Sequence, residues 1–421
     1  MISTQEKTPG QRDIRTSRVP HDAPCQVPRV SVLTASRDRP YALGLAAALV
    51  AQGMSFDFIG GDEVDSPELN GNPQVNFLNF RSQREDAGPW EKITRVLAYY
   101  LRLIRYAALA RPKIFHILWN NKFEWLDRTM LMAYYRLLGK KIVFTVHNVN
   151  IRTRDGGDSW FNRATLKFQY RRCDHILVHT EKMKRELMAD FAIPGGRVTV
   201  IPFGINNTVA GTALTRAEAR RSLGIRNDEK VLLFFGNIAP YKGLEFLIAA
   251  FMEVQKRDLN HQSSAYRLVI AGRPKGCEEY WRGLQKLISS SGFETRILQR
   301  IEYVPDEQTE IYFKAADVLL LPYTHVFQSG VLFLGYSFGL PVIATDVGGL
   351  RDEIIENETG LVCRPQDALD LADTIERFFA SDLYRKADIV RPAIRHHANE
   401  RYSWSKVADL TARVYSKLIE N

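Results

Sequence analysis

Apolar and polar positions along the chain follow two alternating patterns. Short runs rich in β-branched and aromatic residues predict strands at 31–35, 114–118, 141–147, 175–180 and 198–204. Longer segments with apolar residues at helical spacing lie between them, at 91–110, 124–138 and 181–191. Strands that alternate with helices predict βαβ units and therefore a parallel sheet.

The same alternation restarts after a polar, turn-rich stretch at 205–229. Further strands are predicted at 231–236, 267–272, 317–323, 341–346 and 360–363. We therefore predict an α/β protein with two Rossmann-like, doubly wound domains that face each other across a cleft. The predicted parts are a flexible tail (1–28), an N-terminal domain (29–205), a C-terminal domain (206–385) and a C-terminal helical segment (386–421). Ligands of such sheets bind beyond the carboxyl ends of the strands.

Composition narrows the choice of partner and compartment. The 421 residues carry a formal net charge of +9, which favours nucleic acid, a phosphorylated ligand or an acidic lipid surface. No zinc-finger spacing or RNP-like aromatic strand is present, so nucleic acid is not expected. The four cysteines form no CxxC pair, which argues against a zinc site and fits a reducing compartment. The chain shows neither an apolar run of roughly 18 residues nor a signal peptide, so we expect a cytoplasmic protein.

The stretch "FFGNIAPYKGLEFL", residues 234–247, is the first candidate site. An apolar run ends at Gly236, and a helical pattern begins directly after Lys242 and Gly243. Free N–H groups and the dipole at a helix N-terminus attract anions, and a lysine there adds a full positive charge. Lys242 is therefore a candidate phosphate ligand, and a solvated loop lysine is the alternative.

Two later turns have a similar form. Gln328, Ser329 and Gly330 precede an apolar helical run that begins at Val331, so Ser329 is a predicted N-cap. This turn either cradles a ligand or only caps the helix. A glycine pair, Gly348–Gly349, also leads from a strand into a helix, but two glycines alone are a weak signal.

The first half of the chain offers candidates for the opposite wall of the cleft. His147 and Asn148 end a predicted strand, and the alternative for His147 is a structural role in the core. Arg37 and Arg39 flank Asp38 in the loop after the first strand, where a solvated loop is the alternative.

Several motifs in this order resemble a GT-B glycosyltransferase, most closely glycosyltransferase family 4. The motifs are "TVHN", "VHTEKMKREL", "VTVIPFGIN", "FFGNIAPYKGLEFLIAAF", "YVPDEQTEIYFKAADVLLLPY" and "FGLPVIATDVGGLRDEI". The resemblance implies that the C-terminal domain binds a nucleotide-sugar donor and that the N-terminal domain binds the acceptor. It also implies transfer without a metal or other cofactor, and no DxD motif is evident.

The resemblance also assigns roles to individual residues. Lys242 would grip the donor diphosphate, and His147 would act as the catalytic residue near the transferred sugar. Tyr303 and Val304 would pack on the nucleotide base. The remaining expected donor-binding residues are Gly236, Arg273, Gln328, Ser329, Gly330 and Val331, and the expected acceptor-binding residues are Arg37, Arg39 and Asn148.

Two departures from the family pattern affect the donor site. Val326 and Leu334 stand where the family usually has two glutamates, so the usual carboxylate contacts to sugar and ribose are missing. Asn237, the residue after Gly236, begins a loop without the arginine that the family often has there, and Arg273 would compensate. Retaining stereochemistry therefore rests on the resemblance alone.

Three functions remain open at this stage. A metal-independent, retaining hexosyltransferase is favoured over a nucleotide-sugar epimerase of the same two-domain plan and over a non-catalytic sugar-nucleotide-binding subunit. An oxidoreductase is disfavoured because no GxGxxG follows a strand.

Segment 90–107 bears on the acceptor, because it mixes apolar, aromatic and basic residues at helical spacing. It is either an ordinary domain helix or a helix that rests on an anionic membrane surface. With the resemblance, it favours a lipid-linked saccharide acceptor in bacterial surface or exopolysaccharide synthesis. Peripheral association with the inner face of the plasma membrane is then expected.

Overall fold

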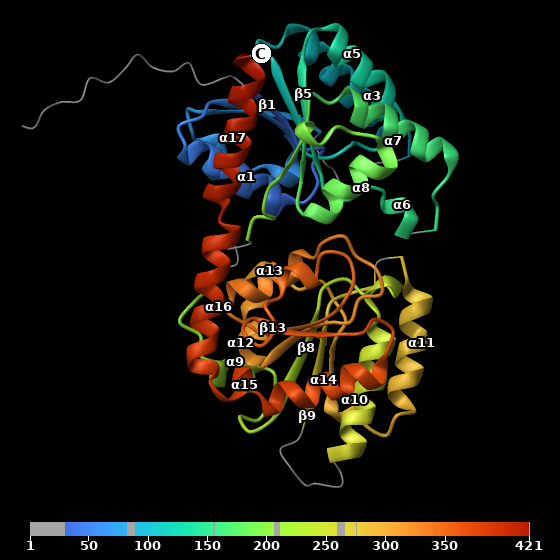
Figure 1. Cartoon of the computed structure of the whole chain (residues 1–421), viewed down its shortest axis with the longest axis vertical. Coiled ribbons are helices and arrows are strands. Elements are labelled where there is room, and N and C mark those ends of the chain that lie inside the picture. The colour runs from blue at the N-terminus through green and yellow to red at the C-terminus, as the bar shows by residue number, and fades with distance from the viewer. Residues whose placement is uncertain are drawn as a thin grey trace, which may run out of the picture.

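The computed structural model describes residues 30–81, 89–154, 156–205, 211–258, 266–274 and 276–420. The predicted tail at 1–28 lies outside the described residues. Two parallel sheets are present, with strand orders β3-β2-β1-β4-β5-β6-β7 and β10-β9-β8-β11-β12-β13 (Figure 1). The predicted α/β fold of two Rossmann-like units is confirmed.

The N-terminal sheet contains seven short strands. They are β1 (Val30–Leu33), β2 (Phe56–Gly61), β3 (Val75–Arg81), β4 (Ile114–Ile117), β5 (Lys141–Val146), β6 (His175–Val178) and β7 (Val198–Val200). The helices of this half are α1 (Arg39–Ala51), α2 (Pro67–Asn70), α3 (Pro89–Leu109), α4 (Glu124–Leu126), α5 (Met132–Leu137), α6 (Ile151–Arg154), α7 (Trp160–Arg172) and α8 (Glu181–Phe191). A π-helical turn, η2 (Asp127–Leu131), joins α4 to α5.

The C-terminal sheet contains six strands. They are β8 (Lys230–Phe235), β9 (Tyr266–Ala271), β10 (Ile297–Arg300), β11 (Val318–Leu321), β12 (Val342–Thr345) and β13 (Gly360–Cys363). Its helices are α9 (Arg216–Ser222), α10 (Leu244–Asp258), α11 (Glu278–Ser289), α12 (Asp306–Ala315), α13 (Gly330–Ser337), α14 (Ala368–Ala380) and α15 (Asp382–Arg385).

The apolar runs form strands because helices cover both faces of each sheet. Every residue of β1, β4, β6, β11 and β12 is buried, and such strands read as continuous hydrophobic runs. Three strands, β2, β3 and β10, were not predicted. Both β3 and β10 lie at sheet edges and are partly exposed, so their sequences mix polar and apolar residues.

The chain crosses between the two halves twice, and the two crossings touch. The final helices are α16 (Ala387–Tyr402), which packs against α13, and α17 (Trp404–Glu420), which packs against α1 (Figure 1). The backbone N–H of Ile205 donates a 2.9 Å hydrogen bond to the carbonyl of Tyr402. The terminal helix therefore returns to the N-terminal half.

Buried contacts hold this terminal helix in place. Nδ1 of His116 in β4 lies 2.5 Å from the Tyr415 hydroxyl of α17, and its Nε2 lies 2.7 Å from the Thr145 hydroxyl. The Trp404 ring fills the space above two glycines, since a Cβ at Gly44 or Gly204 would approach it within 2.3–2.5 Å. Only glycine at these two positions leaves room for the start of α17 to pack against the segment that crosses between the halves.

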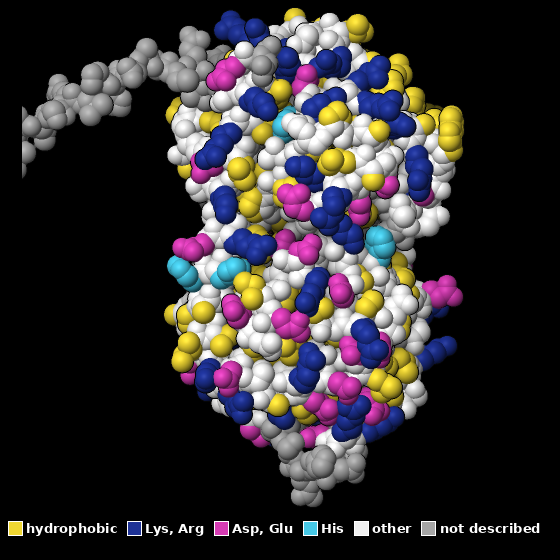
Figure 2. Space-filling view, in the orientation of Figure 1, with side chains coloured by type: hydrophobic (Ala, Val, Ile, Leu, Met, Phe, Trp, Pro, Cys, Tyr) yellow, Lys and Arg dark blue, Asp and Glu magenta, His cyan; other side chains and the backbone are white. Residues whose placement is uncertain are grey.

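The face of the molecule seen in Figure 2 carries charge of both signs, with many basic side chains over the N-terminal half. Within the described ranges, no helix is both long enough and apolar enough to cross a membrane.

Candidate active site between the two sheets

A cavity of about 510 Å³ lies where the two halves meet. From the N-terminal half it is lined by Asp38, Pro40, Tyr41, Asn148, Phe203 and Gly204. From the rest of the chain it is lined by Asn237, Tyr241, Lys242, Tyr323, Val326, Gln328, Ser329, Gly330, Val331, Leu334 and Trp404. Predicted residues from both halves therefore lie around one cavity, at the carboxyl ends of the parallel strands.

Lys242 is the buried cation of this cavity. Its side chain follows β8 on a short 3₁₀ turn, Pro240–Lys242, and the residue is only 7% exposed. The Nζ atom lies 5.2 Å from the centre of the Tyr323 ring, and no salt bridge joins it to a carboxylate among the described residues. A buried charge needs a partner, so this site is suited to an anionic ligand.

Glycines fix the backbone around the lysine. Gly243 has φ 61° and sits directly before α10, and a Cβ there would lie 2.0 Å from the Pro322 carbonyl oxygen. The loops after β8 and β9 are also in contact, because a Cβ at Gly272 would lie 1.9 Å from the carbonyl oxygen of Gly236. Predicted donor residue Gly236 thus shapes the floor below Lys242 rather than lining the cavity.

The start of α13 forms a second anion-binding feature on the cavity wall. Ser329 occupies the N-cap position, as predicted, but its side chain makes no capping hydrogen bond. Its hydroxyl lies 3.3 Å from the Tyr323 hydroxyl instead. The first N–H groups of α13, from Gly330 and Val331, are therefore not satisfied by a cap and remain for a ligand.

Gln328 is anchored behind this turn. Its Nε2 donates a 3.3 Å hydrogen bond to Glu353, which also accepts a hydrogen bond from Tyr402 at the crossing between the halves. Burial raises the pKa of Glu353 above its ordinary value. The donor turn and the crossing are thus linked through one buried carboxyl group.

His147 lies behind the opposite wall. It is absent from the residues that line the cavity, although its neighbours Asn148 and Tyr41 line it. Its ring stacks on Trp119 at 4.3 Å with an interplanar angle of 1°, and Tyr41 packs edge-on at 4.7 Å. Burial, with smaller contributions from His179 and His116, lowers the pKa of His147 well below its ordinary value, so the ring is neutral at pH 7.

His179 is a neighbour of His147 that sequence reasoning missed. It follows β6, which pairs with β5, and its Nε2 lies 3.0 Å from Nδ1 of His147. Its position directly after β6 could have indicated the pairing, because His147 directly follows β5 and neighbouring parallel strands end at the same edge of a sheet.

The predicted acceptor residues separate in the structure. Asn148 lines the cavity, whereas Arg37 and Arg39 are exposed and are not among the lining residues. Asp38, between the two arginines, lines it instead. The backbone explains the difference, since Ala35, Ser36 and Asp38 all have left-handed φ angles of 44–55°. Asp38 is exposed as well, but this turn brings it to the cavity lining, and its carboxylate accepts a 3.4 Å hydrogen bond from the N–H of Tyr41.

Three further predicted donor-binding residues lie outside the cavity lining: Arg273 and the two predicted base-binding residues, Tyr303 and Val304. Arg273 and Tyr303 follow β9 and β10, and the guanidinium lies 5.4 Å from the centre of the Tyr303 ring. Tyr303 is 62% exposed, so one aromatic surface is open to a ligand. Val304 is buried and packs in the core.

The two residues in place of glutamates make part of the cavity wall apolar. Val326 and Leu334 both line the cavity and are largely buried. A second cavity of about 270 Å³ shares Val326 and extends between α8 and the loops after β11 and β12. Gly348 is required there, because a Cβ would lie 1.7 Å from the carbonyl oxygen of Val326.

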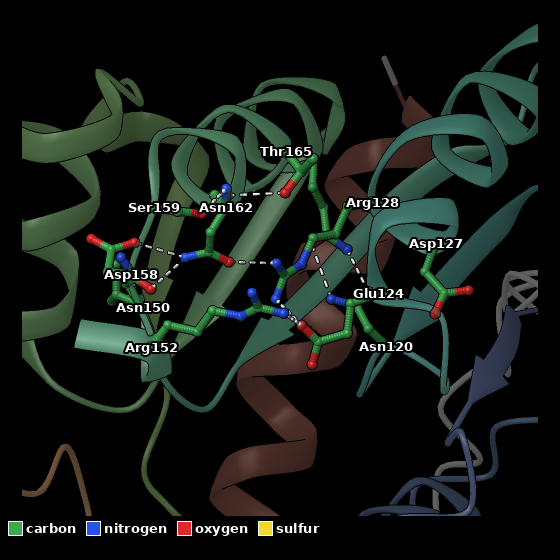
Figure 3. A network of polar contacts seen from close by, with 12 residues as sticks. Asn120, Glu124, Asp127, Arg128, Asn150, Arg152, Asp158, Ser159, Asn162 and Thr165 are labelled. Carbon is green, nitrogen blue, oxygen red and sulfur yellow. Dashed lines mark hydrogen bonds and ion pairs between the residues drawn. The ribbon is translucent and has the colours of Figure 1, made fainter. Parts of the chain in front are cut away.

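A polar network supports the loops of the N-terminal wall. Figure 3 shows Arg128 between Glu124 and Asn162, at distances of 2.7 and 2.9 Å. Asn162 also donates 3.0 Å and 2.9 Å hydrogen bonds to Asn150 and Asp158. Because Asn150 is two residues from Asn148, this network fixes the loop that carries a cavity residue.

In the part of the chain that the structure describes, no three His, Cys, Asp or Glu side chains are grouped so that they could hold a metal ion.

Comparisons with known proteins agree with this architecture. Family models match residues 40–209 (Glycosyltransferase Family 4) and residues 215–395 (Glycosyl transferases group 1). A D-inositol 3-phosphate glycosyltransferase of Corynebacterium diphtheriae is 26% identical over 345 residues, or 78% of each chain. Among solved structures, sucrose-phosphate synthase from Thermosynechococcus elongatus has a TM-score of 0.74 at 20% identity, covering 93% of this chain and 99% of that one. Anabaena HepE in complex with UDP-glucose has a TM-score of 0.70 at 14% identity, covering 92% and 99%.

The geometry at Gly243 predicts a site-specific cost of adding one methyl group. We expect Gly243→Ala to lower the free energy of unfolding by more than Gly276→Ala, measured by urea denaturation. Both glycines have left-handed φ angles, of 61° and 70°, but a Cβ at Gly276 meets nothing within 4 Å. Left-handed backbone alone costs roughly 1–2 kcal/mol. Equal losses in the two variants would mean that the contact with Pro322 imposes no constraint.

Proposed function

Because this chain is a GT-B glycosyltransferase of the group 1, family 4 type, we propose that it transfers a sugar from a nucleotide-sugar donor to an acceptor hydroxyl in the cleft. The observation that carries the proposal is Lys242, a buried cation beside the uncapped start of α13. The structures of Anabaena HepE with UDP and with UDP-glucose support a nucleotide-sugar donor.

The site chemistry follows from the charge of the leaving group. When the bond between the sugar and the diphosphate breaks, negative charge develops on the diphosphate. Lys242 and the N–H groups of Gly330 and Val331 are already in place to stabilise it, and such preorganised electrostatic stabilisation is usually the largest catalytic term. Arg273 and Tyr303 would hold the nucleotide base farther along the same sheet edge.

The sugar and its stereochemistry remain predictions. Val326 and Leu334 supply no hydrogen-bond acceptors from their side chains, so hydroxyl contacts would come from the N-terminal wall, where Asp38 and Asn148 lie. Retention stays an expectation from the family resemblance, and NMR of the product's anomeric centre tests it. Incubation with donor alone separates the alternatives: an epimerase converts the free donor, and a binding subunit binds it without turnover.

We predict that Lys242 and Tyr303 contribute to different parts of donor binding. Lys242→Ala should weaken binding of UDP about 10- to 150-fold, because a hydrogen bond to a charged group contributes about 1.5–3 kcal/mol. It should weaken the binding of inorganic pyrophosphate by a similar factor. Tyr303→Ala should weaken the binding of UDP by about 1 kcal/mol, the low end for base–aromatic stacking, and leave the binding of pyrophosphate unchanged. Calorimetric titration measures all four affinities.

Two controls accompany this experiment. Lys256→Ala removes an exposed lysine of α10 and should leave both ligands unaffected. Lys242→Arg should restore binding only in part, since a planar guanidinium does not replace a compact ammonium in a narrow turn. If Lys242→Ala melts normally and binds both ligands like the parent, the assigned phosphate site is incorrect.

We also propose that transfer needs no metal, because the lysine and the helix N-terminus meet the diphosphate charge. Turnover should persist in the presence of excess EDTA. Activity that disappears in EDTA and returns on addition of magnesium or manganese would contradict this proposal.

The acceptor is proposed to be a lipid-linked saccharide at an anionic membrane surface. Helix α3 packs Tyr99, Tyr100, Leu103 and Ala107 into the core. Four further apolar residues of this helix, Ile93, Leu97, Leu101 and Ile104, are 39–67% exposed at spacings of four, four and three residues. Arg102 and Arg105 are exposed on the same helix. This apolar stripe with basic neighbours has the composition of an interfacial helix.

The stripe continues onto neighbouring elements. The Tyr134 hydroxyl of α5 donates a 3.2 Å hydrogen bond to the carbonyl of Ile104, which joins the two helices. Met130 and Leu137, from η2 and α5, are 61% and 85% exposed. A cytoplasmic protein that rests on the inner face of the plasma membrane through this surface would meet a lipid-linked acceptor there.

We predict that vesicles with anionic lipid bind the protein and that binding weakens as salt rises, since exposed charges are screened beyond about 10 Å at 0.1 M. Leu97→Glu with Leu101→Glu should abolish co-sedimentation with these vesicles. The matched control, Leu369→Glu with Ile389→Glu, changes two exposed apolar residues of the C-terminal half and should bind normally. If the α3 variant still binds these vesicles, the proposed surface is not the one that contacts the membrane.

A further inference from the structure

Two histidines from neighbouring strands form a pair behind the N-terminal wall of the site. Nε2 of His179 lies 3.0 Å from Nδ1 of His147. His179 is only 3% exposed, and nothing in the role proposed for the site yet uses it. A contact of this length between two ring nitrogens requires one proton between them, so the two rings must adopt matched tautomers.

Aromatic neighbours hold the orientation of both rings. His147 is parallel to Trp119, with ring centroids 4.3 Å apart, and Tyr41 packs edge-on against both histidines at 4.7 and 5.6 Å. Phe203, which lines the cavity, packs edge-on against His179 at 5.0 Å. Neither imidazole can therefore exchange its nitrogens by rotation without displacing these rings.

The surroundings of His179 keep its ring neutral at pH 7. Burial lowers the pKa of His179 to about 4, and the backbone at Ile201 and Pro202 opposes this shift. Nδ1 of His179 is buried and has no hydrogen-bond partner among the described residues, so the contact with His147 is the only one described for its ring nitrogens.

We propose that His179 is a positioning residue that fixes His147 in the Nδ1–H tautomer. With its own proton on Nδ1, His179 accepts a hydrogen bond at Nε2 from Nδ1–H of His147. Nε2 of His147 is then an unprotonated acceptor, and it is a buried atom without a hydrogen-bond partner among the described residues.

The role of this acceptor follows from its place, and it rests on the transferase function proposed above. The neighbours of His147, Tyr41 and Asn148, line the cavity. A sugar or acceptor hydroxyl that reaches Nε2 of His147 would donate a hydrogen bond to it. In the opposite tautomer, Nε2 would carry a proton and could only donate a hydrogen bond to the hydroxyl oxygen. His179 thus selects whether the histidine behind this wall accepts or donates a hydrogen bond at Nε2.

The direct test is nitrogen NMR of the full-length protein with ¹⁵N-labelled histidine. His147 is assigned from the signal that His147→Gln loses. We expect its Nδ1 to be protonated and its Nε2 to be bare at pH 7, and we expect His179→Ala to shift the proton to Nε2. A wild-type His147 with its proton on Nε2 overturns the proposal, whether or not the protein transfers sugar.

A double-mutant cycle tests the consequence for transfer. His179→Ala should lower kcat about 3- to 10-fold, the effect of one neutral hydrogen bond, with the donor KM unchanged. In a His147→Ala background it should have no further effect, and His179→Gln, whose amide oxygen can accept from Nδ1–H, should restore most of the rate. Independent, multiplicative losses overturn the proposal.

The matched control is His175→Ala. His175 is a buried histidine of the same strand whose Nε2 lies 2.8 Å from the Thr199 hydroxyl, at the opposite end of β6 from His179. The His175→Ala substitution should leave kcat and the nitrogen signals of His147 unchanged. If the wild-type protein turns over no donor, the proposed function fails while the NMR result still decides the tautomer.

Discussion

A lysine ammonium that is buried without a carboxylate partner in the described part of the chain is the constraint on which this site depends. Desolvation makes such a buried charge costly unless an anion binds beside it. The local structure keeps Lys242 in that position, because Gly243 allows the left-handed turn and Gly272 lets the end of β9 approach Gly236. The uncapped start of α13 adds N–H groups near the same cavity. These features favour a diphosphate over an uncharged ligand.

The second half of the site comes from the other sheet, and contacts far apart in the sequence keep the two halves together. Trp404 lines the cavity and packs on Gly44 and Gly204. The Glu353 carboxyl group joins the donor turn at Gln328 to Tyr402, where the chain crosses between the sheets. Donor contacts and the relative position of the two halves are thus mechanically connected through buried groups.

The sequence predicted those parts of the fold and site that depend on local pattern. Buried strands such as β11 are continuous apolar runs, and Lys242 and Ser329 stand at helix starts that spacing alone indicates. Edge strand β3 was missed because its exposed positions are polar.

Features that depend on backbone angles or on distant contacts were not predictable in this way. Left-handed angles at Ala35 and Ser36 turn Asp38, rather than Arg37 or Arg39, towards the cavity. The pairing of His147 with His179 needs the register of β5 against β6. Tyr415, which holds α17 through His116, is 299 residues away from it in sequence.

A crystal structure of the protein with UDP bound tests the phosphate site most directly. We expect the diphosphate to lie within hydrogen-bond distance of Lys242 Nζ and of the N–H groups of Gly330 and Val331, with the base beside Tyr303. A diphosphate bound elsewhere, with Lys242 still lacking an anionic partner, would contradict it.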